Sequence, residues 1–434
     1  MVFSTRGLVL GATALLGAGA VVTGAGLHLS SSWAVFRDSP KEVIDQVWQV
    51  INQEYVDGTF NGVDWRAVRT QYLNRNYAST DEAYTAVREM VDKLGDPYTR
   101  FMDPGQFQSM RIDTSGELTG VGIQISQDEE TKKITVISPI EGSPASDAGI
   151  RAQDIILEVD GQSTEGMDIN QVVSLIRGPV NSNVVLTISR GTQELSYTLK
   201  RARIELHPVR FSQKSSPMGD IGYIRLTQFN SNAETEMRNA IRELDSQDVA
   251  GFILDLRFNP GGLLDSSAKI ARMWMDHGDI VSTIDRQGVE VRMSAERRGK
   301  LTDKPLVVLV DGGSASASEI LAGALQDNNR AVLVGTKTFG KGLVQMVHPL
   351  RDGSGLAVTI AKYYTPSGRD INKKGIEPDI TVELTEEQQE KLTRDTVGTQ
   401  EDPQYLRALS ALNEQITAQR SQIQSSAPEQ GVSN

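Results

Sequence analysis

The 434-residue sequence contains no cysteine, only four histidines and few aromatic residues. Because cysteine is absent, disulfides, thiolate metal sites and a cysteine nucleophile are excluded, and any nucleophile must be oxygen or nitrogen. Aromatic residues make up 6% of the chain and hydrophobic residues 38%, which is compatible with several ordinary cores. The sequence has no His-Glu-x-x-His run or comparable cluster of ligands, so we expect neither a metal nor another cofactor.

Negative charge exceeds positive charge. The chain has 44 Lys and Arg against 56 Asp and Glu, which gives a formal net charge of -12 and makes nucleic acid a poor partner. Its length exceeds what one core usually supports, and we therefore expect two or three folded units.

The amino terminus carries the longest uncharged stretch. Arg6 precedes residues 7–27, which are small or apolar throughout, and three serines follow at 30–32. This stretch is close to the ~20 residues that span a bilayer, but its many Gly and Ala make it weakly hydrophobic. Residues 1–32 are predicted to be an export signal or a membrane anchor. Both cleavage of the signal and its retention, with membrane contact through residues 7–27, remain open.

The remaining chain divides by the period of its hydrophobic residues. Helical spacing gives way to the period of two typical of strands, then to an alternation of strand and helix that predicts an α/β core. The predicted parts are helical residues 33–112, a mostly β domain at 113–203, an α/β core at 204–384 and a polar, peripheral tail at 385–434. In the core, strands are expected at 221–226, 251–256, 305–310, 331–334 and 356–361, and helices at 233–244, 264–274 and 317–325.

Two glycines stand just before a predicted strand in Leu118-Thr119-Gly120-Val121-Gly122-Ile123. Such a turn can direct consecutive backbone N–H groups toward one point and so bind a carboxylate, while the strand pairs with an extended peptide. A helix at 168–177 would supply Val172 and Ile176 as the opposite wall. Alone, a Gly-x-Gly pair is more often an ordinary turn into a strand.

The motifs around these glycines favour the binding interpretation. Over most of its length the segment resembles a PDZ domain, through Gly142-Ser143-Pro144-Ala145, Ala148-Gly149-Ile150, Asp154-Ile155-Ile156-Leu157 and Val159-Asp160-Gly161. This resemblance implies that the N–H groups of Val121, Gly122 and Ile123 hold the terminal carboxylate of a peptide. It also makes Arg177 a weaker candidate for sensing a bound tail, although an arginine is more often a solvated charge.

A serine-rich turn connects a hydrophobic strand to an apolar helix in Asp311-Gly312-Gly313-Ser314-Ala315-Ser316-Ala317-Ser318-Glu319. Ser316 is therefore predicted at a helix start, where free N–H groups and the helix dipole can stabilise an oxyanion. Ser316 and Glu319 also match a plain capping box, which is the commoner role of such a serine.

A lysine flanked by glycines follows, in Phe339-Gly340-Lys341-Gly342. It can deprotonate Ser316 only when neutral, and lowering a lysine pKa from ~10.4 to ~7.5 needs about 4 kcal/mol of desolvation or charge effects. Lys341 must therefore be largely buried, although most lysines are solvated. If Lys341 opens a strand, Leu343, Gln345 and Val347 share its face, and His348 lies on the other face.

The PDZ-like segment and the Ser316 and Lys341 motifs closely resemble the carboxyl-terminal processing proteases, also called tail-specific proteases. Three further motifs carry the same resemblance: Asp96-Pro97-Tyr98-Thr99-Arg100-Phe101, Asp255-Leu256-Arg257-Phe258-Asn259-Pro260-Gly261-Gly262 and Tyr363-Tyr364-Thr365-Pro366-Ser367-Gly368. The resemblance implies a multidomain α/β plus β fold with an N-terminal helical segment, a PDZ-like domain and a mixed α/β protease core. The implied substrates are proteins or peptides recognised by free C-terminal tails. The implied location is the periplasm, cell envelope or thylakoid lumen.

The same resemblance assigns roles to individual residues. It implies that Ser316 is the nucleophile, Lys341 the general base and then acid, and Gln345 the residue that holds Lys341. The oxyanion hole would use the Ala317 N–H together with that of Gly261 or Gly262. Asp327 matches an aspartate of some family members, but its distance along the helix predicts a structural role. Phe258 departs from the family, in which a polar residue is commoner.

Two other classes of protein compete with this interpretation. A Ser/His/Asp protease would need one of the four histidines, and none is well placed by local pattern. A non-catalytic PDZ adaptor would bind tails without needing Ser316 or Lys341. The sequence leaves the natural substrate and the oligomeric state open.

Overall fold

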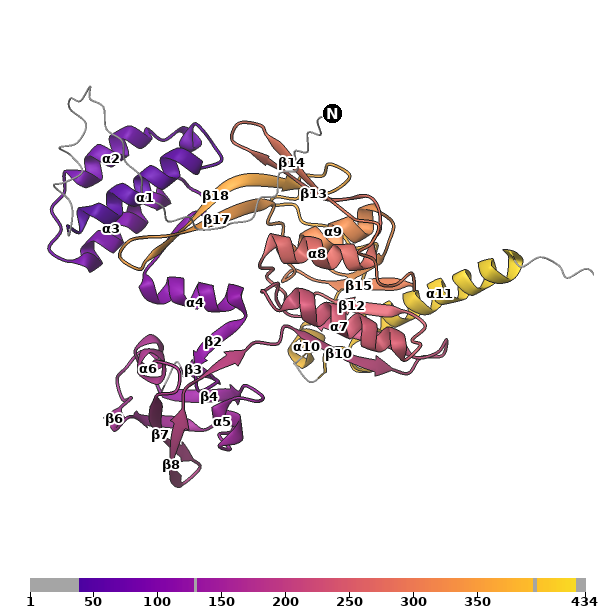
Figure 1. The fold of residues 1–434 in the computed structure, drawn as a ribbon, viewed down its shortest axis with the longest axis horizontal. Coiled ribbons are helices and arrows are strands. Elements are labelled where there is room, and N and C mark those ends of the chain that lie inside the picture. The colour runs from indigo at the N-terminus through magenta and orange to yellow at the C-terminus, as the bar shows by residue number, and fades with distance from the viewer. Residues whose placement is uncertain (1–38, 129–130, 393–395, 427–434) are drawn as a thin grey trace, which may run out of the picture.

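The computed structural model describes residues 39–128, 131–392 and 396–426, and it has the predicted fold class (Figure 1). The predicted export segment at residues 1–32 lies outside these residues. In the described part of the chain, no helix is long and apolar enough to cross a membrane.

The N-terminal part is a group of helices that packs against a long β-hairpin. Its elements are α1 (Lys41–Glu54), α2 (Trp65–Leu73), α3 (Thr80–Asp92), the short strand β1 (Arg100–Met102) and α4 (Pro104–Ser115). The apolar stripe of α1 is fully buried at Ile44, Val47 and Ile51. These side chains form one cluster with Leu356 and Val358 of β18 (Gly355–Tyr364). The helices therefore support the hairpin of β17 (Leu343–Pro349) and β18, which follows the Lys341 loop.

The PDZ-like part is a small antiparallel sheet with one main helix. Its elements are β2 (Glu117–Gly120), β3 (Ile123–Gln127), β4 (Ile134–Pro139), α5 (Pro144–Asp147), β5 (Ile155–Val159), β6 (Gln162–Ser163), α6 (Ile169–Ile176), β7 (Asn183–Arg190), β8 (Gln193–Lys200) and β9 (Ala202–Glu205). The sheet has the order β3-β4-β5-β7-β8, with β6 beside β5. The predicted capping box of Asp168 and Gln171 begins α6.

The core is a three-layer α/β/α unit. Its elements are β10 (Val209–Lys214), β11 (Ile221–Leu226), α7 (Ala233–Ser246), β12 (Phe252–Asp255), α8 (Leu264–Trp274), β13 (Asp279–Asp285), β14 (Glu290–Ser294), β15 (Leu306–Val310), α9 (Ala317–Asp327), β16 (Val332–Gly335), β19 (Ile380–Thr381), α10 (Glu386–Lys391) and α11 (Pro403–Ser426). The central sheet has the order β10-β11-β12-β15-β16-β19 and is parallel except at β10. Helices α7, α8 and α9 cover one face, and α11 packs on the other.

The predicted catalytic segments meet at one edge of this sheet. Strand β12 leads to Gly261 and Gly262, β15 leads to Ser316, and β16 leads to Lys341. Because these strands are parallel neighbours, their carboxyl ends lie at the same edge, where ligands of open α/β sheets bind.

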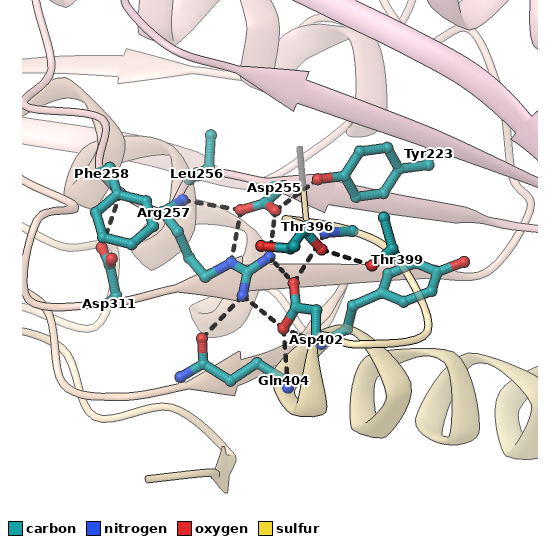
Figure 2. A network of polar contacts seen from close by, with 12 residues as sticks. Tyr223, Asp255, Leu256, Arg257, Phe258, Asp311, Thr396, Thr399, Asp402 and Gln404 are labelled. Carbon is teal, nitrogen blue, oxygen red and sulfur yellow. Dashed lines mark hydrogen bonds and ion pairs between the residues drawn. The ribbon is translucent and has the colours of Figure 1, made fainter. Parts of the chain in front are cut away.

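The prediction that residues 385–434 form a peripheral tail is wrong, because much of residues 396–416 is part of the core. Tyr405, Ala408 and Leu412 of α11 are at most 2% exposed and pack against the central sheet. Before the helix, Asp402 forms a buried ion pair with Arg257 at the end of β12 (Figure 2). The sequence indicates only a short amphipathic piece around Leu406, Leu409 and Leu412 in a polar segment. Leu409 and Leu412 are buried, and Leu406 is 39% exposed.

Candidate active site

Ser316 lies on a sharp turn between β15 and α9. Its backbone has φ 55° and ψ -113°, a conformation that costs a residue with a side chain of order 1–3 kcal/mol. The Ser316 N–H donates to Oε2 of Glu319 at 2.9 Å, which is one half of the predicted capping box. A serine on a strained strand-to-helix turn presents its hydroxyl at the sheet edge.

Lys341 lies in the loop after β16. It lines the same pocket as Ser316, and this pocket has a volume of about 450 Å³. Its Nζ is 4.9 Å from the centre of the Tyr98 ring. Burial lowers the pKa of Lys341 and the charge of Arg100 lowers it further, while Asp96 and Glu319 act in the opposite direction. This is the direction that a lysine base requires.

Glu319 connects the serine turn to the lysine loop. Its fully buried carboxylate accepts hydrogen bonds from the N–H groups of Ser316 and Lys341 on Oε2. Its other oxygen accepts from the Thr338 hydroxyl at 2.6 Å and from the Gly340 N–H at 2.7 Å. From the sequence Glu319 is expected only as a capping residue, because nothing local indicates that it also bonds to the lysine loop.

Gln345 lies on β17 and lines the pocket together with Lys341. Its amide donates to the Thr359 hydroxyl at 3.4 Å, and that hydroxyl donates to Asp96 at 2.6 Å. The strand begins at Leu343 and has a register shift between Val344 and Gln345. Leu343, Gln345 and Val347 line the pocket with Lys341, as expected, and His348 does not. Val344, beside the register shift, lines it as well.

The predicted oxyanion residues pack directly against one another. A Cβ added to Gly261 would lie 2.6 Å from the Ala315 carbonyl and 2.9 Å from the Ala317 nitrogen, so only glycine fits. The Gly261 N–H already donates to the Asn259 side chain at 2.9 Å. Gly262, at φ 139°, has no hydrogen bond from its N–H to any described residue.

Neither Asp327 nor Phe258 lines the pocket of Ser316. Asp327, at the end of α9, accepts from the N–H and hydroxyl of Ser367 at 2.9 and 2.7 Å and pairs with Arg369. Burial alone would raise the pKa of Asp327, but hydrogen bonds from Thr365 and Ser367 hold it below its usual value. Phe258 is 52% exposed at φ 60°, a conformation that asparagine adopts more readily than phenylalanine.

The turn from Gly120 to Ile123 requires glycine at one position. Gly122 has φ 79°, and a Cβ there would lie 2.2 Å from the Ser143 Cβ. The carbonyl of Val121 accepts from Ala145, which anchors the turn to α5. Val172 and Ile176 are buried in the PDZ-like core, and Ile123 packs against the same cluster.

Arg177 follows α6 and faces Asp113 of α4. Burial lowers the pKa of Arg177, and the charge of Asp113 acts in the opposite direction. Burial also raises the pKa of Asp113, and Arg177 opposes that shift. Asp113 lines the pocket of Ser316, so this charge interaction connects the PDZ-like part with the candidate active site.

The described histidines pair elsewhere. His207 contacts Glu236, His277 contacts Asp276, and His348 contacts Glu54 at 2.8 Å, and none of the three lines the pocket. His28 lies outside the described residues. Over the described ranges, no group of His, Asp or Glu side chains is placed to hold a metal ion.

Ser316 on its strained turn shares a pocket with a lysine whose pKa burial lowers, an arrangement that suits a serine peptidase. Comparison with protein families agrees: the model of Peptidase family S41 matches residues 220–382, the PDZ domain model residues 135–190, and the Tricorn protease C1 domain model residues 36–91.

Curated relatives extend this agreement over most of the chain. A carboxyl-terminal-processing protease of Synechocystis is 45% identical over 375 residues, which is 86% of this chain and 86% of the relative. One of Picosynechococcus is 46% identical over 385 residues, covering 88% and 92%. The solved photosystem II D1 C-terminal processing protease is 40% identical, with a TM-score of 0.54 over 80% of this chain and 94% of that one. The chain therefore belongs to peptidase family S41.

Proposed function

We propose that the protein is an endopeptidase that cuts proteins near their C-terminal tails, with Ser316 as nucleophile and Lys341 as base. The observation that carries the proposal is that both side chains line one pocket, while burial lowers the pKa of Lys341. The relatives named carboxyl-terminal-processing proteases support cleavage near C-termini.

In this mechanism the neutral amine of Lys341 takes the hydroxyl proton of Ser316 while the Ser316 oxygen attacks the peptide carbonyl. The N–H groups of Ala317 and Gly262 stabilise the oxyanion, since Gly261 already donates to Asn259. Lys341 then gives its proton to the leaving amine, and water releases the acyl group by the reverse steps. Gln345, held by Thr359, limits the positions open to the amine.

Tail recognition is assigned to the PDZ-like part. The N–H groups of Val121, Gly122 and Ile123 bind the terminal carboxylate, and β3 pairs with the extended tail. Arg177, which follows α6, interacts by charge with Asp113 of the catalytic pocket. Docking of a tail aligns Lys341 with Ser316, so binding and cutting are coupled.

The proposed location is outside the cytoplasm, with residues 1–32 as export signal or anchor. The cyanobacterial and chloroplastic relatives support the thylakoid lumen among the expected compartments.

The test compares cleavage of a protein with an extended C-terminal tail by the wild type, Ser316→Ala and Lys341→Ala. Both variants should lose cleavage and still bind the tail. A PDZ adaptor would leave its function unchanged in both variants. A Ser/His/Asp protease would keep cleavage in Lys341→Ala and lose it when His207, His277 or His348 is replaced. The amidated tail should be cut more slowly than the free acid, and equal rates would contradict tail recognition.

A further inference from the structure

Tyr363 of β18 contacts the carbonyl of the candidate nucleophile. Its hydroxyl donates to the Ser316 carbonyl oxygen at 3.2 Å, and its side chain is 1% exposed. The Tyr363 N–H donates to the carbonyl of Gly342, beside Lys341, at 3.1 Å. One residue is thus bonded to both the serine turn and the lysine loop.

The Ser316 carbonyl belongs to the same peptide unit as the Ala317 N–H. Because a trans peptide is planar, its C=O and N–H point in opposite directions, and fixing one fixes the other. The Ile320 N–H also bonds to this carbonyl at 3.0 Å, as part of α9. On the next peptide, the Ser267 hydroxyl donates to the Ala317 carbonyl at 2.8 Å.

The strained backbone of Ser316 needs such support. A residue at φ 55° and ψ -113° persists only when its surroundings hold it there. Glu319 binds the N–H on one side of Ser316, and Tyr363 binds the carbonyl on the other. Burial raises the pKa of Tyr363 well above its usual value, so the phenol keeps its proton and remains a donor.

We propose that Tyr363 is a positioning residue that aims the Ala317 N–H at the oxyanion of the transition state. This inference rests on the proposed function, because it assumes acyl transfer at Ser316. Tyr363 stabilises the transition state more than the bound substrate, since the charge on the substrate oxygen develops only during attack.

The test is Tyr363→Phe, which removes the hydroxyl and keeps the ring. Loss of a whole oxyanion donor costs about 10²–10³ in kcat, and a misaimed donor should cost about tenfold, with KM changed less than about twofold. The affinity for a peptide boronic acid, whose adduct with serine is tetrahedral, should fall by the same factor as kcat/KM. The control is the neighbouring Tyr364→Phe, on the other face of β18. It should leave kcat, KM and the affinity for the boronic acid unchanged.

An unchanged kcat in Tyr363→Phe, or a loss seen only in KM, would overturn the inference. A second variant, Tyr363→Met, also lacks the hydroxyl but packs differently, and it should show the same loss of kcat. If the losses of the two variants follow their melting temperatures instead, the role is structural and the inference fails. Retained cleavage by Ser316→Ala would refute the proposed function itself, which separates the two failures.

Discussion

Arg257 and Asp402 form a fully buried ion pair, with Nη2 and Oδ2 2.7 Å apart and neither side chain exposed. Arg257 also pairs with Asp255 at 2.6 Å, and the Tyr223 hydroxyl donates to the same carboxylate (Figure 2). Asp402 in turn accepts N–H groups from Gly398 and Tyr405. The segment before α11 is therefore bonded to the strand end that leads to the oxyanion glycines.

Asp402→Asn should destabilise the fold, because it leaves Arg257 with one fewer buried counter-charge. Breaking a buried pair from one side costs about 3–5 kcal/mol, measured as the free energy of unfolding in urea. Glu387→Gln is the control: its pair with Lys391 is 2.6 Å long but exposed, and its loss should cost under about 1 kcal/mol. Equal effects of the two variants would contradict the assigned role of Asp402.

The same network predicts a loss of stability in acid. Burial alone would raise the pKa of Asp255, but Arg257 and Tyr223 hold it below its usual value. A carboxyl with a lowered folded pKa contributes stability above its unfolded pKa, and that contribution disappears as pH falls through the folded pKa. The free energy of unfolding should therefore decrease below about pH 4, as seen in urea titrations at several pH values.

The pH dependence of catalysis should report Lys341. Since only the neutral amine acts as base, kcat/KM should rise with pH and level off above its pKa, below the ~10.4 of an ordinary lysine. Arg100→Gln removes a positive charge that lowers this pKa, so the pKa should rise and the ascending limb should move to higher pH. Arg298→Gln, at an exposed position away from the pocket, serves as control. If the ascending limb of the pH profile does not move in Arg100→Gln, the assignment of Lys341 as the base is refuted.

Gly122→Ala should weaken tail binding. The new Cβ would lie 2.2 Å from the Ser143 Cβ at a backbone φ of 79°, so the turn that presents the N–H groups must shift. In the Ser316→Ala background, fluorescence anisotropy with a labelled tail peptide should show at least about a tenfold weaker affinity, the factor that 1.4 kcal/mol gives. Gly142→Ala also has a positive φ but meets nothing within 4 Å, and it should change affinity less.

Glu319→Gln should reduce kcat strongly while the fold remains intact. The carboxylate accepts four hydrogen bonds that join the two catalytic loops, and an amide would point its NH₂ at some of the same donors. A misplacement of about 1 Å costs about 10² in rate. Glu377→Gln, which contacts the same loop from its exposed side through Lys337, is the matched control. Equal values of kcat for Glu319→Gln and Glu377→Gln in steady-state kinetics would contradict the role of Glu319.

Local pattern was enough to predict some elements and not others. The helix at 264–274 has its predicted bounds, because its apolar positions repeat with helical spacing. Ser316 and Lys341 share a pocket as predicted, since parallel strands bring their carboxyl ends together. The buried role of residues 396–416 was missed, because the partner of Asp402 is Arg257, 145 residues away in sequence. Glu319 of α9 and Tyr363 of β18 bond to residues far away in sequence, which no local spacing reveals.

In the proposed mechanism the amine of Lys341 activates the hydroxyl of Ser316. The test is the rate at which a fluorophosphonate labels Ser316, followed by mass spectrometry in the wild type and in Lys341→Met. Labelling at Ser316 should become faster as Lys341 loses its proton, and it should nearly vanish in the variant. Equal labelling of the two proteins, or labelling at another residue, would contradict this mechanism.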